Sequence, residues 1–415
     1  MNAPSSPIPS IIPLRIEPSD PRAALTAQVK LLAVRAGLAV SAVTSADPFP
    51  EVAAHLDRHI EAGHVAGMDW FTSERAHFSA DVRNLHPEAM SIISVGLSYW
   101  PGPTSMPNDG VLRGRISRYA WGRDYHRVIK RRLKAFHGAL EDLLGREIEG
   151  RLLVDTARIV ERAVAARAGL GWYGKHACII SPGHGSWLLL GEMILDLDLV
   201  PDAPMDKNCG RCTICIDKCP TGAIIAPYTI DAPTCISFLT IEERGVIPRD
   251  MRSKMGNWVY GCDVCQEVCP YTGAARLADD AELIPASIDN AYPSLHWLLA
   301  MSDLEFGATY FGTPVPRTKR RGLARNAAIA LGNVGSHTDI PVLARALSTH
   351  DEPLVRGHAA WALGKIGGVS GRRSLDTRLH AEPDDWVRTE IRAALEMEGE
   401  TRLPELSNSE TMSPH

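Results

Sequence analysis

The chain has 415 residues, 45% of them hydrophobic, so it is long enough for two or three domains with cores of their own. No apolar run reaches the ~20 residues of a membrane-spanning helix. The formal net charge of −5 argues against a uniformly basic nucleic-acid-binding protein. The first residues contain neither a basic region followed by an apolar stretch nor a twin arginine, so we expect a cytoplasmic protein.

The first half of the chain alternates helical and strand patterns. A proline-rich stretch at residues 1–13 is expected to be a disordered tail. Apolar periodicity then predicts helices over residues 22–36 and 125–144, the second of them basic, and strands over residues 91–97 and 151–154. This alternation indicates an α/β domain over residues 14–201.

Asp155 follows the strand at residues 151–154. In a site lined by apolar residues, desolvation would raise its pKa and suit it to proton donation. Residue types alone favour a plainer role as a helix N-cap, because a helical pattern comes next. Further along, Gly169, Gly171 and Gly174 either let the backbone approach a large planar cofactor or form a helix-to-strand turn. Their spacing does not match a dinucleotide-binding fingerprint.

Two features lie just before the next domain. Residues 181–186 separate two apolar runs and predict a hairpin loop. Cys178 lies in an apolar run and is expected to be a small buried side chain, or, less favoured, to line a pocket. Pro201 and Pro204 mark a boundary, after which a cluster-binding module is expected over residues 202–285.

Eight of the nine cysteines form two closely spaced runs and one isolated position. They are Cys209, Cys212, Cys215, Cys219, Cys235, Cys262, Cys265 and Cys269. A proline follows the last cysteine of each run, which is the spacing of a protein that holds two [4Fe-4S] clusters. Zinc is disfavoured because a third cysteine continues the first run, and disulfides are disfavoured in a chain with ample core.

The ligands are expected to cross between the two clusters, because the cysteine before each proline projects toward the other cluster. The first cluster would be held by Cys209, Cys212, Cys215 and Cys269. The second would be held by Cys262, Cys265, Cys219 and Cys235. Since the second run lacks a middle cysteine, Cys235 must supply the missing thiolate. Two such clusters relay single electrons.

The last region repeats with a period of thirty-two residues, as in Ala330, Ala362 and Ala394. This predicts α-helical HEAT-like repeats over residues 286–400, followed by a tail at residues 401–415. Residues 316–392 hold thirteen Lys and Arg against eight Asp and Glu, a local net charge of +5. Their concentration at the start of the repeats favours phosphate contacts over a merely solvated face. The candidates are Arg317, Lys319, Arg320, Arg321 and Arg325.

From about residue 20 to residue 398 the chain resembles the epoxyqueuosine reductases of bacterial queuosine biosynthesis. The stretches that carry the resemblance are residues 121–126, 154–156, 161–175, 235–242 and 255–263, together with the cysteine runs and the repeats. The sequence departs from the family pattern at His176, where Asn is usual. It also lacks an Arg near Ser79, although Arg75 and Arg83 lie close by.

The resemblance implies a cobalamin enzyme that reduces epoxyqueuosine to queuosine at the wobble position of tRNAs for tyrosine, histidine, asparagine and aspartate. It implies that Asp155 is the proton donor and that the corrin lies between the α/β domain and the second cluster. The expected cobalamin neighbours are Gly174, Lys175, Ile179, Ser237 and Asp263. A flavodoxin or ferredoxin would supply electrons to a monomeric enzyme.

Two other classes stay open. A corrinoid reductive dehalogenase also pairs cobalamin with two clusters, but it would lack the basic repeats and usually carries a twin-arginine signal. A non-catalytic electron-transfer subunit would bind neither cobalamin nor RNA.

Overall fold

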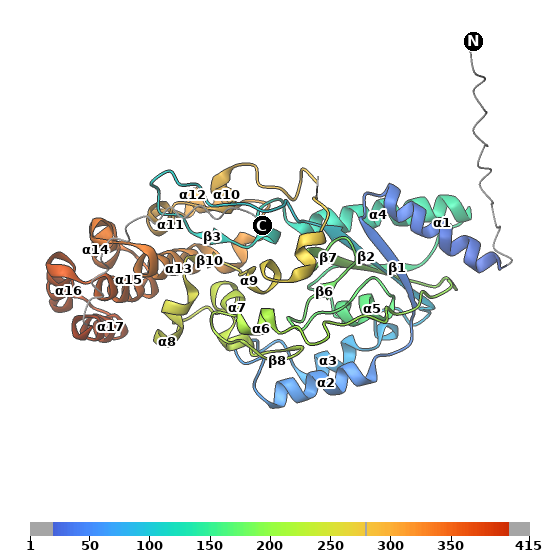
Figure 1. Ribbon diagram of the computed structural model, residues 1–415, viewed down its shortest axis with the longest axis horizontal. Helices are drawn as coiled ribbons and strands as arrows, with labels where there is room; N and C mark the ends of the chain where they lie inside the picture. The colour runs from blue at the N-terminus through green and yellow to red at the C-terminus, as the bar shows by residue number, and fades with distance from the viewer. Residues whose placement is uncertain (1–19, 279, 398–415) are drawn as a thin grey trace, which may run out of the picture.

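An antiparallel sheet organises the N-terminal region of the computed structural model, which describes residues 20–278 and 280–397 (Figure 1). The strand order is β1-β2-β7-β4, and each neighbouring pair is antiparallel. The strands are β1 (Val40–Ser45), β2 (Ser91–Ser98), β7 (Leu188–Leu195) and β4 (Gly150–Leu153). The two inner strands, β2 and β7, are apolar along most of their length, as expected of a sheet covered on both faces.

Helices cover both faces of this sheet. Ile93 and Val95 point into a core shared with α1 and α4, whereas Ile92 and Ile194 pack on α5. The helices of this region are α1 (Pro21–Arg35), α2 (Pro50–Glu61), α3 (Ser73–Ser79), α4 (Tyr125–Leu144) and α5 (Glu161–Arg167). The basic helix expected over residues 125–144 is confirmed as α4, and the strand expected over residues 151–154 is β4, one residue earlier.

The hairpin expected around residues 181–186 is wrong in its strand pairing. Ser181 and Gly185 do form a bridge that closes a tight turn. However, β6 (Ile179–Ile180) pairs with β5 (Trp172–Tyr173), while β7 joins the main sheet. A Cβ at Gly171 would collide with the Ile180 carbonyl, and one at Gly169 with the Ala203 carbonyl. These glycines therefore permit contacts of the chain with itself, which supports the helix-to-strand turn.

The cluster-binding region consists of short elements joined by loops. Its elements are α6 (Ile214–Asp217), β8 (Ile224–Ala226), β9 (Thr229–Ile230), α7 (Ile236–Ile241), α8 (Arg249–Arg252), β10 (Trp258–Tyr260) and α9 (Val264–Glu267). Strand β10 pairs in parallel with β3 (Arg115–Ile116). This pairing joins the region to the α/β part of the molecule. Short 3₁₀ turns lie at Val82–Asn84, Arg118–Ala120, Ala232–Thr234, Ser253–Met255, Pro270–Ala274, Val315–Thr318 and His337–Asp339.

The C-terminal region is helical and forms the far end of the elongated molecule (Figure 1). Its helices are α10 (Ile288–Ala291), α11 (Leu295–Ala300), α12 (Asp303–Tyr310), α13 (Lys319–Val334), α14 (Ile340–Thr349), α15 (Pro353–Ile366), α16 (Gly368–Ala381) and α17 (Asp385–Glu396). A Cβ at Gly332 would lie 2.9 Å from Ala362 Cα, and one at Gly364 would lie 2.8 Å from Ala394 Cα. The repeated glycine thus lets α13, α15 and α17 stack closely.

None of the described helices is long and apolar enough to cross a membrane. The expected tails, residues 1–13 and 401–415, lie outside the described residues.

Candidate functional site

The eight clustered cysteines lie in two groups between the α/β region and the repeats. The Cys215 thiol interacts with Cys209, Cys269 and Cys212, and burial together with these thiols raises its pKa to about 11. In the second group, Cys262 interacts with Cys235 and Cys219. Cys265 interacts with Cys262 and Cys235. These are the two sets that crossed ligation requires, and ligation by each thiolate stays a prediction.

The spacing of the groups differs from that of a single-ion site. All nine cysteines are free thiols. Within residues 20–278 and 280–397, no three side chains of the metal-binding types are arranged around one ion. Thiolates around a cluster stand farther apart than ligands around one zinc ion, whose Zn–S bonds measure about 2.3 Å.

A glycine with a left-handed backbone conformation precedes Cys262, a member of the second cysteine group. Gly261, next to Cys262, has a φ of +67°, and a Cβ there would lie 2.5 Å from Ser117 Cβ. Only glycine adopts this conformation without cost. Next to it, the buried Asp263 accepts hydrogen bonds from Ser117 and Arg118, the backbone N–H of Arg118 lying 2.9 Å away.

Asp155 lies on the loop after β4 and does not cap a helix. The next helix, α5, begins at Glu161 with Val160 as its N-cap, so the N-cap interpretation is wrong. Asp155 adopts a φ of +44°, a strained conformation for a residue other than glycine. Its Oδ2 lies 3.0 Å from Nε2 of His126. The other ring nitrogen, Nδ1, lies 2.8 Å from Oδ1 of Asp124.

The electrostatics of Asp155 are opposite to the sequence-based expectation. Burial does raise the pKa of Asp155, but hydrogen bonds from His126 and Tyr125 outweigh it and hold the pKa below its usual value. Burial lowers the pKa of His126, yet the two carboxylates on its ring raise it to about 9. The histidine is therefore an imidazolium at neutral pH.

The raised carboxyl pKa belongs to a neighbour. Burial, with the charge of Asp155, raises the pKa of Glu161 to about 7. Glu192, in the middle of β7, is fully buried, and burial raises its pKa well above the usual value. Neither Glu192 oxygen has a hydrogen-bond partner among the described residues. Three carboxyls of very different acidity thus lie together.

Cys178 connects this acidic group to the second cysteine group. The Cys178 thiol interacts with Arg162 on one side and Cys265 on the other. Arg162 follows Glu161 and donates to the Ala177 carbonyl at 2.9 Å. Sequence reasoning did not single out His126 or Arg162, although both lie in the stretches that carry the family resemblance.

The expected cobalamin neighbours lie around this region and differ in burial and in whether their polar groups are already hydrogen-bonded. Ile179 is buried and Ser237 half-buried. Lys175 Nζ donates to the carbonyls of Gly210 and Cys212 at 2.7 and 2.9 Å, which ties it to the first cysteine group. A Cβ at the buried Gly174 would meet the His176 ring. The Asp263 carboxylate accepts its hydrogen bonds from Ser117 and Arg118, so it links the second cysteine group to the α/β region.

Comparisons with known proteins agree over most of the chain. Residues 80–156 match the family model for epoxyqueuosine reductase QueG, residues 208–272 a 4Fe-4S double cluster binding domain, and residues 319–396 HEAT repeats. The epoxyqueuosine reductase of Xanthomonas campestris pv. campestris is 37% identical over 361 residues, covering 86% of this chain and 99% of that protein. The chain belongs to the epoxyqueuosine reductase family.

Solved epoxyqueuosine reductases share its fold. One, bound to an epoxyqueuosine-modified tRNA-Tyr stem loop, has a TM-score of 0.83 and 34% identity, covering 90% of this chain and 98% of that one. Another, from Bacillus subtilis, has its catalytic aspartate loop swung out of the active site; its TM-score is 0.82 at 33% identity, with the same coverage.

In this member of the epoxyqueuosine reductase family, the residues of the basic run differ from one another in exposure and in ion pairing, and therefore in how freely they could contact RNA. Lys319 is exposed, and Arg317 is exposed but paired with Glu242 at 2.5 Å. Arg321 is half-buried, and Arg320 lies between Asp303 and Asp351.

The expectation of a phosphate contact at Arg325 is wrong for this structure. Arg325 is fully buried, and its guanidinium donates to the carbonyls of Leu239, Glu243 and Gly245. It fixes α13 to the cluster-binding region.

Proposed function

We propose that this protein reduces epoxyqueuosine to queuosine at the wobble position of tRNA, with cobalamin and two [4Fe-4S] clusters. The observation that carries the proposal is a continuous set of electrostatic interactions. It runs from the second cysteine group through Cys178, Arg162 and Glu161 to Asp155, which is hydrogen-bonded to His126. This set supports an electron relay and a proton-donating group at one site.

The proposed division of labour follows the regions of the chain. Residues 14–201 bind cobalamin and carry the acid, residues 202–285 hold the clusters, and residues 286–400 bind tRNA. The crossed ligand sets are Cys209, Cys212, Cys215 and Cys269 for the first cluster, and Cys262, Cys265, Cys219 and Cys235 for the second. A flavodoxin or ferredoxin reduces the first cluster of a monomeric enzyme.

The residues between Asp155 and the second cysteine group fit cobalamin. Glu192 and His176 carry buried polar atoms without a hydrogen-bond partner in the described residues, namely both carboxylate oxygens and Nε2. The amide groups at the rim of a corrin would satisfy such atoms, and unsatisfied buried polar groups are otherwise costly. Gly174, Ile179 and Ser237 would contact the same ligand. When bound and reduced, cobalamin supplies a strong nucleophile.

The overall reaction sets the proton requirement. Converting an epoxide to an alkene and water consumes two electrons and two protons. An epoxide oxygen leaves poorly as an alkoxide, so a proton must reach it as the ring opens. Asp155 is placed to deliver that proton, and a second is needed before water leaves.

His126 is the proposed source from which Asp155 is reprotonated. Its imidazolium holds a proton 3.0 Å from the Asp155 carboxylate, and Asp124 stabilises the charge from the other side. Glu161, with a pKa of about 7, is a second reservoir near neutral pH. Each turnover therefore draws on groups that are protonated before the substrate binds.

The substrate class rests on the relatives and on the charge of the repeats. Relatives that match this chain over more than nine tenths of their own length are named epoxyqueuosine reductase, and one was solved with a modified tRNA-Tyr stem loop.

An anaerobic assay tests the proposal. Protein reconstituted with iron, sulfide and cobalamin is mixed with an epoxyqueuosine stem loop and a low-potential reductant, and the RNA is analysed by mass spectrometry. We expect loss of one oxygen atom from the modified base, and no loss when cobalamin is omitted. A fully loaded protein that binds the RNA but leaves it unchanged would contradict the proposal, and a protein that binds neither cobalamin nor RNA would favour an electron-transfer subunit.

A further inference from the structure

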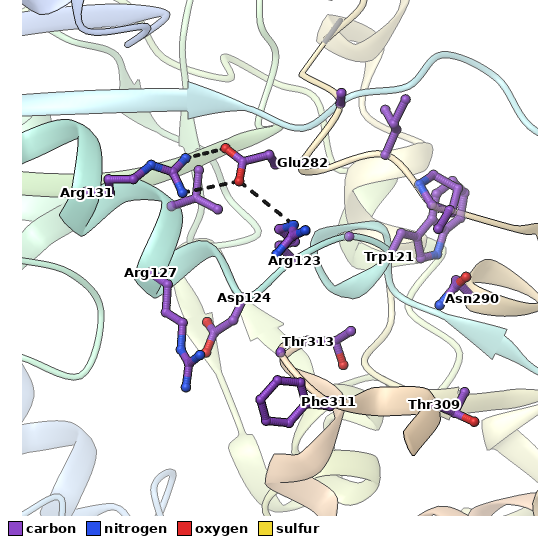
Figure 2. A pocket seen from close by; sticks show the side chains of 17 residues that line it. Trp121, Arg123, Asp124, Arg127, Arg131, Glu282, Asn290, Thr309, Phe311 and Thr313 are labelled. Atoms are coloured by element: carbon purple, nitrogen blue, oxygen red, sulfur yellow. Dashed lines mark hydrogen bonds and ion pairs between the residues drawn. The ribbon is translucent and has the colours of Figure 1, made fainter. Parts of the chain in front are cut away.

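A cleft of about 700 Å³ opens beside the start of α4 (Figure 2). One wall is the α4 side, with Arg123, Asp124, Arg127 and Arg131, and the opposite wall carries Phe311. Backbone hydrogen bonds hold the loop before α4 to two other segments. The Arg123 N–H donates to the Glu282 carbonyl and the Asp124 N–H to the Gly312 carbonyl, each at 2.7 Å. The cleft is therefore a fixed feature of the fold.

Positive charge remains available inside this cleft. The two acidic side chains are committed, since Glu282 pairs with Arg131 and Asp124 with His126. The guanidinium of Arg127 forms no hydrogen bond within the part of the chain that the structure describes, and its one acidic neighbour in the cleft is Asp124, whose pKa its charge lowers. Arg123 is 77% exposed, and its ion pair with Glu282 is long, at 3.9 Å. Two arginines thus face solvent at the cleft without a strong partner.

Phe311 is 81% exposed on the other wall of the same cleft. A phenyl ring left in water gains nothing for the fold, because its apolar area stays unburied. An exposed aromatic ring beside exposed arginines is the combination that binds single-stranded nucleic acid: a base stacks on the ring, and the cations contact the phosphates.

The cleft is adjacent to the proposed reaction centre. Asp124 lines the cleft, and its carboxylate contacts His126, which contacts Asp155. A nucleotide in the cleft would therefore be separated from Asp155 by two side chains, Asp124 and His126. This separation suits a neighbour of the reacting nucleotide in a continuous strand.

We infer that this cleft is a binding site for a nucleotide adjacent to the modified one in the substrate RNA, with its base stacked on Phe311 and its phosphate held by Arg123 and Arg127. The inference rests on the proposed function, because it takes RNA as the substrate. It assigns to α4 an RNA contact separate from the basic run at the start of α13.

Equilibrium binding of a labelled epoxyqueuosine stem loop to the reconstituted enzyme, without reductant, tests the site. Phe311→Ala should raise Kd by roughly 5-fold to 100-fold, the range for loss of one base–aromatic stack, whereas Phe311→Trp should keep near-normal affinity. Leu304→Ala is the matched control, since Leu304 is 87% exposed and lies outside the cleft. Arg127→Gln should flatten the salt dependence, whereas Lys134→Gln, farther along α4, should alter it less.

A second arm identifies the nucleotide. Removing the base on one side of the modified nucleotide should weaken binding to the wild type, but should not weaken binding to the Phe311→Ala variant further. If Phe311→Ala binds as tightly as the wild type, or if the two losses simply add for both neighbours, the site is excluded. Wild-type turnover is measured in parallel. An unaffected Phe311→Ala variant of an enzyme that converts epoxyqueuosine overturns this inference alone, whereas absent wild-type turnover counts against the proposed function alone.

Discussion

Asp155 is held in an unusual state by two local features. Its backbone φ of +44° costs of order 1–3 kcal/mol for a residue other than glycine, and such strain concentrates at functional sites. Its carboxylate is held by His126 and Tyr125, so it is more acidic than a free aspartate. Asp155 is therefore ionised at neutral pH, so in the proposed function the proton it delivers must pass through it from the neighbouring His126 imidazolium as negative charge develops on the epoxide oxygen.

His126 gives the residue-scale prediction. Its pKa rises from 6.5 to about 9 on folding, so its two ion pairs stabilise the folded protein fully below pH 6.5. That stabilisation is lost as pH rises through about 9. The wild-type thermal midpoint should therefore fall across this interval, and turnover should fall as pH passes about 9.

His126→Gln keeps a polar side chain but cannot carry the charge. We expect a lower midpoint at pH 6.5, a flatter pH dependence of stability, and slow turnover at every pH. The measurement is a series of thermal melts and rate assays between pH 6 and pH 10. An unchanged pH profile in the variant would show that His126 does not supply the proton.

At the scale of elements, the cysteine groups depend on segments far apart in sequence. Cys235 is the residue before α7, yet it interacts with Cys262 next to β10. The parallel pairing of β10 with β3 and the left-handed conformation of Gly261 hold that loop in place. The second cluster would thus depend on one ligand with no substitute in its own run.

Cys235→Ala tests that dependence. Wild-type protein reconstituted anaerobically should bind about eight irons and eight sulfides, as two [4Fe-4S] clusters require. The variant should lose mainly one cluster and keep the signal of the other. Cys178→Ala is the control and should keep both, because Cys178 is not an expected ligand. Stoichiometric zinc in anaerobically purified wild type would contradict the assignment.

At the scale of the whole molecule, the sequence predicts what depends on local pattern. Helix α4 and the thirty-two-residue repeats follow from periodicity, and the two sets of cysteines follow from spacing. The pairing of β6 with β5 and the burial of Arg325 depend on partners distant in the chain, which no local pattern specifies. The lowered pKa of Asp155 could not be predicted for the same reason, because His126, which lowers it, is 29 residues away in the sequence.

RNA binding also belongs to this scale, because it draws on several elements. Replacing Arg317, Lys319 and Arg321 together by Gln should weaken stem-loop binding and lower the slope of log affinity against log salt by about 0.7 per lost phosphate contact. Cluster spectra should stay unchanged. Arg372 and Arg373 on α16 provide a control double replacement outside the run. Equal affinity and equal slope in the triple variant would place the RNA elsewhere.

The most direct test of the account is turnover by Asp155→Asn. The variant removes the carboxylate and retains the shape of the side chain, so clusters, cobalamin content and stem-loop affinity should match the wild type, while the thermal midpoint should fall slightly because one of the two ion pairs of His126 is lost. The rate of epoxyqueuosine reduction should fall by about 10²-fold to 10⁴-fold, the usual contribution of a general acid. A rate close to that of the wild type in a fully loaded variant would show that Asp155 is not the proton donor.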